Sequence, residues 1–300
     1  MHDAEPSPAD FVASLAPEVD RLVIAGHRAA GPRVRPIREE LALPNFGVLI
    51  DLRKLLLSPR GMDLVAAAAI ERYRNPGDIV ADIGRHVSQG LLRWNLERVV
   101  PTNGGRMLLD RLTIALGEAV DILWPDVEPA RDVTATLHAV IEEARASLSP
   151  DRFPAFYAED GGFMPDRPSP AMLLWSMLSS LRYLRADAHA LAWRARGLNR
   201  EEILTLTAGC NRIDTTTVTQ VWAGVLADAR TLFQTLDRLR ERGWVSQSGE
   251  TWTVTSAGRE VRREIERDTN RYNSTPYAIL EPPQRERLLD RLGRLPGDGG

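Results

Sequence analysis

The 300-residue chain contains one cysteine, one lysine and no long apolar run. A single cysteine, Cys210, excludes an intrachain disulfide and favours a reducing compartment. The most apolar stretch, residues 171–184, is shorter than the roughly 18 apolar residues of a membrane span, and it contains Ser, Arg and Tyr, so we expect no membrane partner. The first residues lack the basic and apolar regions of a secretory signal, which makes a cytoplasmic location the expectation.

The balance of charge argues against a strongly basic nucleic-acid-binding surface. The formal net charge is −3, and Lys54 is the only basic residue other than the arginines and histidines. Any affinity for DNA must therefore come from a local patch. The length and composition suffice for one large or two modest folded domains.

The usual motifs of metal-dependent or covalent catalysis are absent from the sequence. The five histidines show no His-x-x-x-His spacing, and a single cysteine cannot form Cys-x-x-Cys. Gly-x-Gly-x-x-Gly, P-loop and Gly-x-Ser-x-Gly motifs are also missing. We therefore expect no metal, no cofactor and no catalytic residue, and we interpret Cys210 as an ordinary buried thiol.

Residues 228–259 have the pattern of a helix, a tight hairpin and a second helix. One face of the first helix carries Leu232, Phe233, Leu236 and Leu239. Gly243 ends this helix, and the strand-like runs 244–247 and 251–255 surround a Ser-Gly-Glu turn. Gly258 then begins an amphipathic helix. This order is that of the second half of a winged helix-turn-helix.

The same pattern occurs 153 residues earlier in the chain (243 − 90 = 153), without a gap. Gly243 corresponds to Gly90 and Gly258 to Gly105. The apolar face corresponds to Ile79, Val80, Ile83 and His86. A period of half the chain suggests a duplication. We predict a mainly α fold with small β-hairpin wings, in which two winged helix-turn-helix modules surround a helical hub.

Turn and capping signals divide the chain into five parts. These are an N-terminal helical or irregular segment (1–60), a first winged-helix module with hub helices (61–150), a linker or lid loop (151–169), a second module (170–295) and a disordered tail (296–300). In the first part we expect a helix over 17–30, ended by Gly31-Pro32, and either a strand or a short helix over 41–57. Further helices are predicted over residues 62–73, 78–89, 105–124, 129–148, 170–196, 215–223, 227–242, 258–272 and 284–295.

The second half resembles the MarR-type winged-helix family in residues 230–232, 236–245 and 255–259. The whole chain, including Arg185 to His189, is similar to helix-turn-helix proteins of high-GC bacteria. MarR-type regulators are dimers whose two recognition helices enter successive major grooves of double-stranded DNA. The resemblance implies that one chain can supply both halves as a fused pseudo-dimer.

A DNA-reading face is the first candidate site. The positions of helix 227–242 outside the apolar stripe include Arg230, Thr231, Gln234, Thr235 and Arg238. Arg and Gln read guanine and adenine edges, and Thr suits a phosphate or a thymine methyl group. In the first copy, Asp78 and Asp82 are expected on an outer face, where they would repel phosphate. The alternative is that these faces are ordinary solvated helix surfaces and that one or both copies no longer bind DNA.

A small-molecule pocket is the second candidate site. The predicted helix 170–196 carries Arg185, Asp187 and His189 together with Trp175 and Trp193. Cations walled by aromatic rings suit an anionic or aromatic ligand, and residues 153–164 could form a lid. The alternative is structural, with Asp187 paired to a neighbouring arginine and His189 hydrogen-bonded at a domain seam.

Two functions follow from these candidates. The first is a ligand-responsive, DNA-binding transcription regulator of MarR-like type, possible also as a homodimer, in which a ligand shifts the spacing of the recognition helices. The second is a small-molecule-binding protein or enzyme that keeps the tandem winged-helix scaffold without DNA recognition. The acidic first copy favours the second function, whereas Arg230 and Gln234 favour the first.

Overall fold

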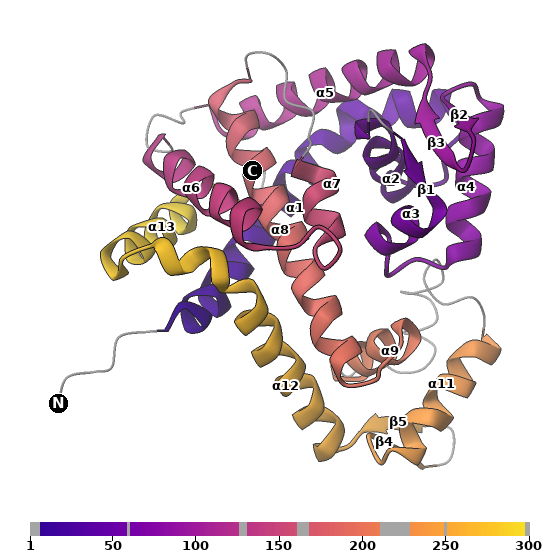
Figure 1. Ribbon diagram of the computed structural model, residues 1–300, viewed down its shortest axis with the longest axis vertical. Helices are drawn as coiled ribbons and strands as arrows, with labels where there is room; N and C mark the ends of the chain where they lie inside the picture. Colours follow the sequence, from indigo (N-terminus) through magenta and orange to yellow (C-terminus); the bar gives the residue numbers. More distant parts are fainter. Residues whose placement is uncertain are drawn as a thin grey trace.

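The computed structural model describes residues 7–58, 61–125, 131–160, 168–210, 229–248 and 251–297. The described chain is mainly helical, with two small antiparallel sheets. Two long helices, α1 (Pro8–Glu40) and α8 (Pro170–Ala195), lie at the centre and pack against each other (Figure 1). The remaining elements are arranged around this pair.

Helix α1 runs without a break through the positions at which the sequence predicted an end. Ser7 and Asp10 form a capping box that starts it, and Pro32 and Pro36 lie inside the helix. An internal proline costs a helix about 3 kcal/mol because it removes a hydrogen bond and crowds the preceding turn. Here the apolar spacing continues through both prolines, with Ala30, Val34 and Ile37 buried. Tertiary packing therefore outweighs the local signal.

The N-terminal half continues with four helices and a small sheet. These elements are α2 (Phe46–Leu57), β1 (Met62–Asp63), α3 (Leu64–Ile70), α4 (Pro76–Ser88), β2 (Leu92–Asn95), β3 (Arg98–Pro101) and α5 (Asn103–Leu123). The stretch 41–57 is thus a helix, begun by the side chain of Asn45, and not a strand. The sheet order is β1-β3-β2, and Met62 pairs with Val99, which shortens the helix predicted over 62–73.

The C-terminal half has a similar order of elements. After α8 come α9 (Arg200–Cys210), α11 (Ala229–Glu241), β4 (Val245–Ser248), β5 (Thr251–Val254), α12 (Ser256–Asn273), the short 3-10 helix η2 (Thr275–Ile279) and α13 (Pro282–Arg294). Asn199 and Glu202 form a capping box at the start of α9, in which they exchange side-chain-to-backbone hydrogen bonds of 3.0 and 2.9 Å. The helix predicted over 215–223 lies outside the described residues.

Two stretches separated by 153 residues have the same order of elements and the same local hydrogen bonds. We call residues 76–123 (α4, β2, β3, α5) the N-terminal hairpin segment and residues 229–273 (α11, β4, β5, α12) the C-terminal hairpin segment. The two strands and the second helix of the C-terminal segment begin 153 residues after their counterparts, as in 245 − 92 = 153, and α11 ends 153 residues after α4 (241 − 88 = 153). Thr102 accepts a hydrogen bond from the Gly105 N–H at 3.1 Å and donates to the Gly90 carbonyl at 2.5 Å. Thr255 does the same in the second segment, at 3.1 and 2.7 Å.

The stretch predicted as a linker or lid loop contains a short helix. Helices α6 (Arg131–Ser147) and α7 (Pro154–Asp160) both contact α8. Phe153 and Phe156 are buried in the core, and the carboxylate of Asp187 accepts hydrogen bonds from the N–H groups of Phe156, at 2.8 Å, and Ala155. The loop prediction for these residues was wrong because aromatic burial and this distant carboxylate stabilise a helical turn between prolines.

The helix contacts at the centre of the molecule follow the same pattern in the two halves. Helix α1 packs along α5, and α8 packs along α12; α1 also contacts α12, and α5 also contacts α8. The core is largely one connected apolar cluster with a smaller one around α9, α11 and the second hairpin. Near the C-terminus, the carbonyl of Pro296 accepts a hydrogen bond from Trp124 Nε1 at 3.0 Å. Within the described ranges, none of the helices has the length and apolar character needed to cross a bilayer.

Candidate nucleic-acid interface

The outer face of α11 presents groups that can read bases. Arg230 and Gln234 are exposed, Thr231 is half-buried, and the ring of Phe233 is exposed between them. These residues come from the first half of the helix, which is the part that contacts base edges in helix-turn-helix complexes. The apolar stripe of Leu232, Leu236 and Leu239 is buried on the opposite side. Arg230 and Gln234 thus lie outside the buried stripe, and their contact with DNA stays a prediction.

Thr235 does not lie on the outer face, which corrects its prediction as a DNA-contacting residue. It is fully buried. Its hydroxyl donates to the carbonyl of Thr231 at 2.7 Å and accepts from Arg238 Nη2 at 3.0 Å. Position 235 is three residues after Leu232 and four before Leu239, so it belongs to the core side of the helix. A threonine tolerates this position because its hydroxyl is satisfied by the carbonyl four residues earlier.

Arg238 forms an ion pair with the buried carboxylate of Glu202, so its guanidinium is not free to bind a DNA phosphate. Its Nε lies 3.2 Å from Glu202 Oε1, and the Glu202 side chain is almost wholly buried. The same carboxylate accepts a hydrogen bond from the Asn199 N–H at the start of α9, so its ion pair with Arg238 connects α11 to α9. The positive charge of Arg238 is largely compensated within the protein.

The matching positions of α4 lack the groups that α11 presents. Subtracting 153 places Gly77, Asp78 and Ala81 where α11 has Arg230, Thr231 and Gln234, and all three are exposed. The expectation that Asp82 faces outward was wrong. Asp82 is buried, and its carboxylate binds Arg74 at 2.5 Å and Arg85 at 2.8 Å. At these three positions α4 therefore offers phosphate no arginine and retains the carboxylate of Asp78.

The two hairpins also differ in the side chains at their surfaces. The tip of the β2–β3 hairpin exposes Trp94 and Leu96, and Leu96 is 94% exposed. Beside the β4–β5 hairpin, the guanidinium of Arg240 lies over the ring of Trp252 at 5.8 Å and hydrogen-bonds to Gln247 at 3.2 Å. Arg242 lies over Trp244 at 4.9 Å. The predicted DNA-contacting residues did not include Arg240 and Arg242. The sequence signal was their position at the end of the helix, directly before a hairpin that contains tryptophan.

The residues of the predicted small-molecule pocket do not gather around one cavity. Trp175 is buried where α8 crosses Gly26 of α1, whereas Trp193 belongs to the separate core around α9 and α11. Asp187 is fully buried in an ion pair with Arg72. Arg185 donates to Asn270 and Glu266 of α12, each at 2.7 Å. The structural alternative therefore describes these side chains better than the ligand pocket does.

His189 is also occupied by the protein. Its Nδ1 lies 2.6 Å from the hydroxyl of Tyr73. Burial, with a smaller contribution from Arg262, lowers the pKa of His189 to about 4. The imidazole is thus neutral near pH 7 and supplies no positive charge for an anionic ligand.

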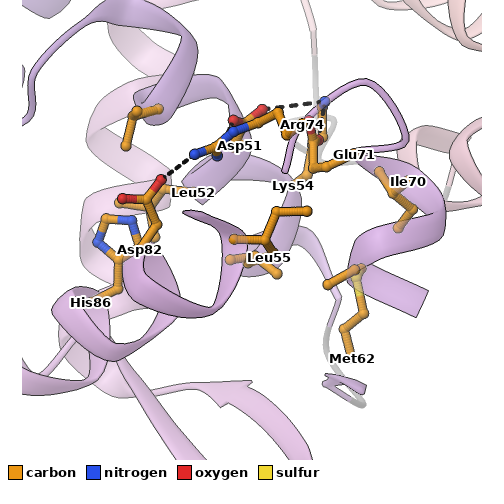
Figure 2. Close-up of a pocket in the computed structure, with 13 residues that line it drawn as sticks. Asp51, Leu52, Lys54, Leu55, Met62, Ile70, Glu71, Arg74, Asp82 and His86 are labelled. Atoms are coloured by element: carbon orange, nitrogen blue, oxygen red, sulfur yellow. Dashed lines mark hydrogen bonds and ion pairs between the residues drawn. The ribbon is translucent and has the colours of Figure 1, made fainter. Parts of the chain in front are cut away.

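An ionic cluster that the sequence analysis missed lies between α2, α3 and α4 (Figure 2). Lys54, the only lysine, is buried and binds Glu71, and its Nζ is 3.6 Å from Asp51. Arg74 connects Asp51, at 2.6 Å, to Asp82, at 2.5 Å. The adjoining cavity of about 20 Å³ has room for about one water molecule. The sequence signal was the i, i+3 pair Asp51 and Lys54 within a helix whose other residues, apart from Arg53, are apolar or glycine.

Burial and the neighbouring charges change the pKa values of the residues in this cluster. Burial and the nearby Glu71 raise the pKa of Asp51 to about 7. Burial alone would raise the pKa of Glu71, but contact with Lys54 lowers it overall. Burial alone would lower the pKa of Lys54, whereas Tyr183 and the two carboxylates raise it. Lys54 and Glu71 therefore form a charged pair, and Asp51 is the member that titrates near neutral pH.

A cationic groove lies along α1. It has a volume of about 640 Å³ and is lined by Arg28, Arg35, Arg38 and Arg182, with Ile24, His27 and Val34 among its other residues. Arg182 also binds Asp20 at 2.9 Å. A concave surface with four arginines attracts anions. In the parts of the chain that the structure describes, no three His, Cys, Asp or Glu side chains are placed to hold a metal ion together.

Comparison with known proteins gives one family and no individual relative. A family model described as a helix-turn-helix family matches residues 88–296, well over half of the chain. The match begins at the end of α4 and covers both hairpins, α11, and the helices from α5 to α13. Neither curated proteins nor solved structures gave a match.

Proposed function

The chain belongs to this helix-turn-helix family, and we propose that it is a DNA-binding regulator built as a fused pair of MarR-like winged helix-turn-helix modules. In this proposal the C-terminal hairpin segment reads DNA through α11, with the β4–β5 hairpin as its wing. The N-terminal hairpin segment keeps the same shape but has lost base-reading groups. One chain would then do what a dimer of single modules does elsewhere.

The duplication is supported by the 153-residue spacing of both segments. Both strands and the second helix of each segment begin at equivalent positions, the threonine caps bind matching glycines, and the long helices contact one another reciprocally. Agreement in the elements, the caps and the packing is hard to obtain by chance from two unrelated sequences. A tandem pair of modules around α1 and α8 is therefore the simplest account.

The observation that carries the DNA-binding proposal is the contrast between α11 and α4. At equivalent exposed positions, α11 has Arg230 and Gln234, whereas α4 has Gly77 and Ala81. Arginine and glutamine can each make two hydrogen bonds to a base edge, and glycine and alanine cannot. We infer that sequence information is read by α11 and that the N-terminal hairpin segment contributes position or partner contacts.

Fluorescence anisotropy with duplexes selected from a random pool tests this proposal. We expect the wild-type chain to bind with a clear salt dependence, and Arg230→Ala and Gln234→Ala each to lose about 1–3 kcal/mol of discrimination. Arg294→Ala, which removes an exposed arginine of α13, is the matched control and should bind like wild type. Binding no tighter than the non-specific range of about 10⁻⁴–10⁻⁶ M at physiological salt would overturn the proposal.

The cationic groove favours a second function, the binding of an anionic small molecule. Its volume suits a small ligand, and its four arginines would neutralise a carboxylate or phosphate. In a ligand-responsive MarR-like regulator, such binding would shift the relative position of the modules. Isothermal titration with phosphate, succinate and benzoate would test it. Binding lost in Arg35→Ala and kept in Arg294→Ala supports the function, and absence of heat with all three anions contradicts it.

A further inference from the structure

The outer face of α5 exposes three large apolar side chains in a row. Met107, Ile114 and Ile122 are 68%, 62% and 66% exposed. Their spacings of seven and eight residues place them on one side of the helix. The row extends over 15 residues (122 − 107), about 22 Å of helix. Helix α5 forms the upper edge of the molecule in Figure 1, away from α11.

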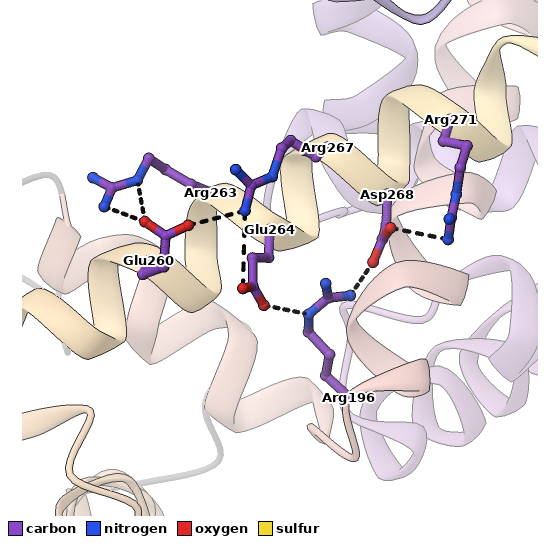
Figure 3. A network of polar contacts seen from close by, with 7 residues as sticks. All are labelled: Arg196, Glu260, Arg263, Glu264, Arg267, Asp268 and Arg271. Carbon is purple, nitrogen blue, oxygen red and sulfur yellow. Dashed lines mark hydrogen bonds and ion pairs between the residues drawn. The ribbon is translucent and has the colours of Figure 1, made fainter.

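The equivalent face of α12 carries charged, solvent-exposed side chains. The apolar face of α5 is therefore unusual within the same molecule. Adding 153 to 107 and 114 gives Glu260 and Arg267. These residues belong to a surface network of alternating charges in which Glu260 binds Arg263 and Arg267, the latter at 2.9 Å (Figure 3). The network continues through Glu264, Arg196, Asp268 and Arg271. At matching positions, α5 thus carries methionine and isoleucine instead of a solvated ion network.

We propose that this face of α5 binds α5 of a second copy of the chain in antiparallel orientation. A two-fold axis midway between Ile114 and Ala115 places Met107 level with Ile122 of the second copy, since both pairs of numbers have the same mean (114.5). It brings the two Ile114 side chains together across the axis. An isologous contact of this kind is the commonest way in which two identical chains associate. The apolar row is then covered along its whole length.

Charge complementarity favours a second copy over another partner. The same axis places Arg111 level with Glu118 of the second copy, because 111 and 118 also have a mean of 114.5. Both side chains are exposed, and each already has a partner on α1, the exposed Glu40 for Arg111 and the half-buried Arg33 for Glu118. Docking therefore creates two alternating rows of Glu40, Arg111, Glu118 and Arg33. On the other flank, Arg106 comes within two residues of Asp121 of the second copy.

The energetic roles of these contacts differ. Exposed ion pairs contribute only about 0–1 kcal/mol each, so the charges select the orientation. The apolar row supplies the affinity, at about 25 cal/mol for each Å² removed from water. This inference goes beyond the proposed function but bears on it, since two chains would together carry two α11 reading helices. Measuring association without DNA keeps the two claims separate.

Sedimentation velocity of the full chain over a wide range of concentration tests the inference. We expect a species of twice the 33.4 kDa chain mass. Ile114→Glu places two carboxylates against each other at the axis and should weaken the dimer at least tenfold. Leu96→Glu makes the same change at another exposed apolar residue, on the hairpin tip, and should leave the dimer intact. A wild-type chain that stays monomeric, or a dimer that both variants disrupt equally, overturns the proposal.

Thiol cross-linking in a Cys210→Ser background tests the antiparallel orientation. With a short bismaleimide, Ile114→Cys should give a covalent dimer, because the two positions meet at the axis. Met107→Cys alone should not, since its copies lie about 22 Å apart, whereas a mixture of Met107→Cys and Ile122→Cys should. Self-cross-linking of Met107→Cys would indicate a parallel arrangement and contradict the proposal. Leu96→Cys serves as the exposed control that should remain uncoupled.

Discussion

A β-carbon on Gly105 would lie 2.2 Å from the carbonyl oxygen of Leu91, and one on Gly258 would lie 2.2 Å from the carbonyl oxygen of Trp244. The two pairs are separated by the same 153 residues. In both hairpin segments, the chain entering the first strand passes so close to the following helix that no side chain fits between them. The glycines are therefore required by the close approach of two backbones and not by an unusual φ angle.

We expect Gly105→Ala and Gly258→Ala to destabilise the protein by similar amounts, about 1–3 kcal/mol each, because a carbonyl group of the backbone must move to admit the methyl group. Gly117→Ala is the matched control in α5, since a β-carbon there meets no atom within 4 Å. It should stabilise the helix by about 0.5–1 kcal/mol. Urea unfolding measures all three. Equal effects at Gly105 and Gly117 would show that the close approach is relieved without cost.

Lys54→Met should destabilise the N-terminal half strongly. It leaves Glu71 buried without the cation that it binds, whereas Asp51 keeps Arg74, and breaking a buried ion pair by removing one partner typically costs about 3–5 kcal/mol. The double variant Lys54→Met/Glu71→Gln removes the uncompensated charge and should recover part of the loss. Arg294→Ala, which removes an exposed pair with Asp290, should cost less than about 1 kcal/mol. The free energy of unfolding from denaturant curves decides between these outcomes.

His189 should make the protein less stable as the pH falls from 6.5 towards 4. Its pKa is lowered to about 4 in the folded chain, so between these values the unfolded chain binds a proton that the folded chain does not. Stability is lost with falling pH at up to about 1.4 kcal/mol per pH unit. His189→Gln, which keeps an acceptor for Tyr73, should flatten the pH dependence of the unfolding free energy. The same change at the exposed His138 should not, and a flattening of equal size there would contradict this account.

Restoring base-reading groups to α4 should strengthen DNA binding. The triple variant Gly77→Arg/Asp78→Thr/Ala81→Gln gives α4 the residues of α11 and removes a carboxylate from its outer face. We expect tighter binding and a salt slope steeper by about 1 for the added phosphate-seeking arginine. Asp290→Arg on α13 changes the net charge by the same +2 at a remote place and serves as control. An equal gain in both proteins would mean that total charge, and not α4, determines affinity.

The sequence predicted the elements of the hairpin segments well because their signals are local. Alternating apolar spacing, the ends at Gly90 and Gly243, and the caps at Thr102 and Thr255 each act within one or two turns of chain. Helix α1 was predicted poorly, because the burial that stabilises it through Pro32 and Pro36 comes from α5 and α8. Local proline signals could not reveal that packing.

The candidate sites depended on contacts between distant residues, and these could not be read from the sequence. Arg72 and Asp187 are 115 residues apart, yet their ion pair removes Asp187 from any ligand pocket. Asp82 can be buried because its carboxylate binds Arg74 and Arg85. Thr235 was misplaced for a different reason. A hydroxyl that donates a hydrogen bond within its own helix can occupy a core position that its polarity alone would disfavour.

The burial of Lys54 leaves guanidinium groups as the cationic side chains of the protein surface. Reagents that acylate ε-amino groups have a single target in this chain, and that target is held by carboxylates between α2 and the turn after α3. Acylation of Lys54 therefore requires that the N-terminal half open locally. The rate of this one modification reports how often that opening occurs, without any label having to be introduced.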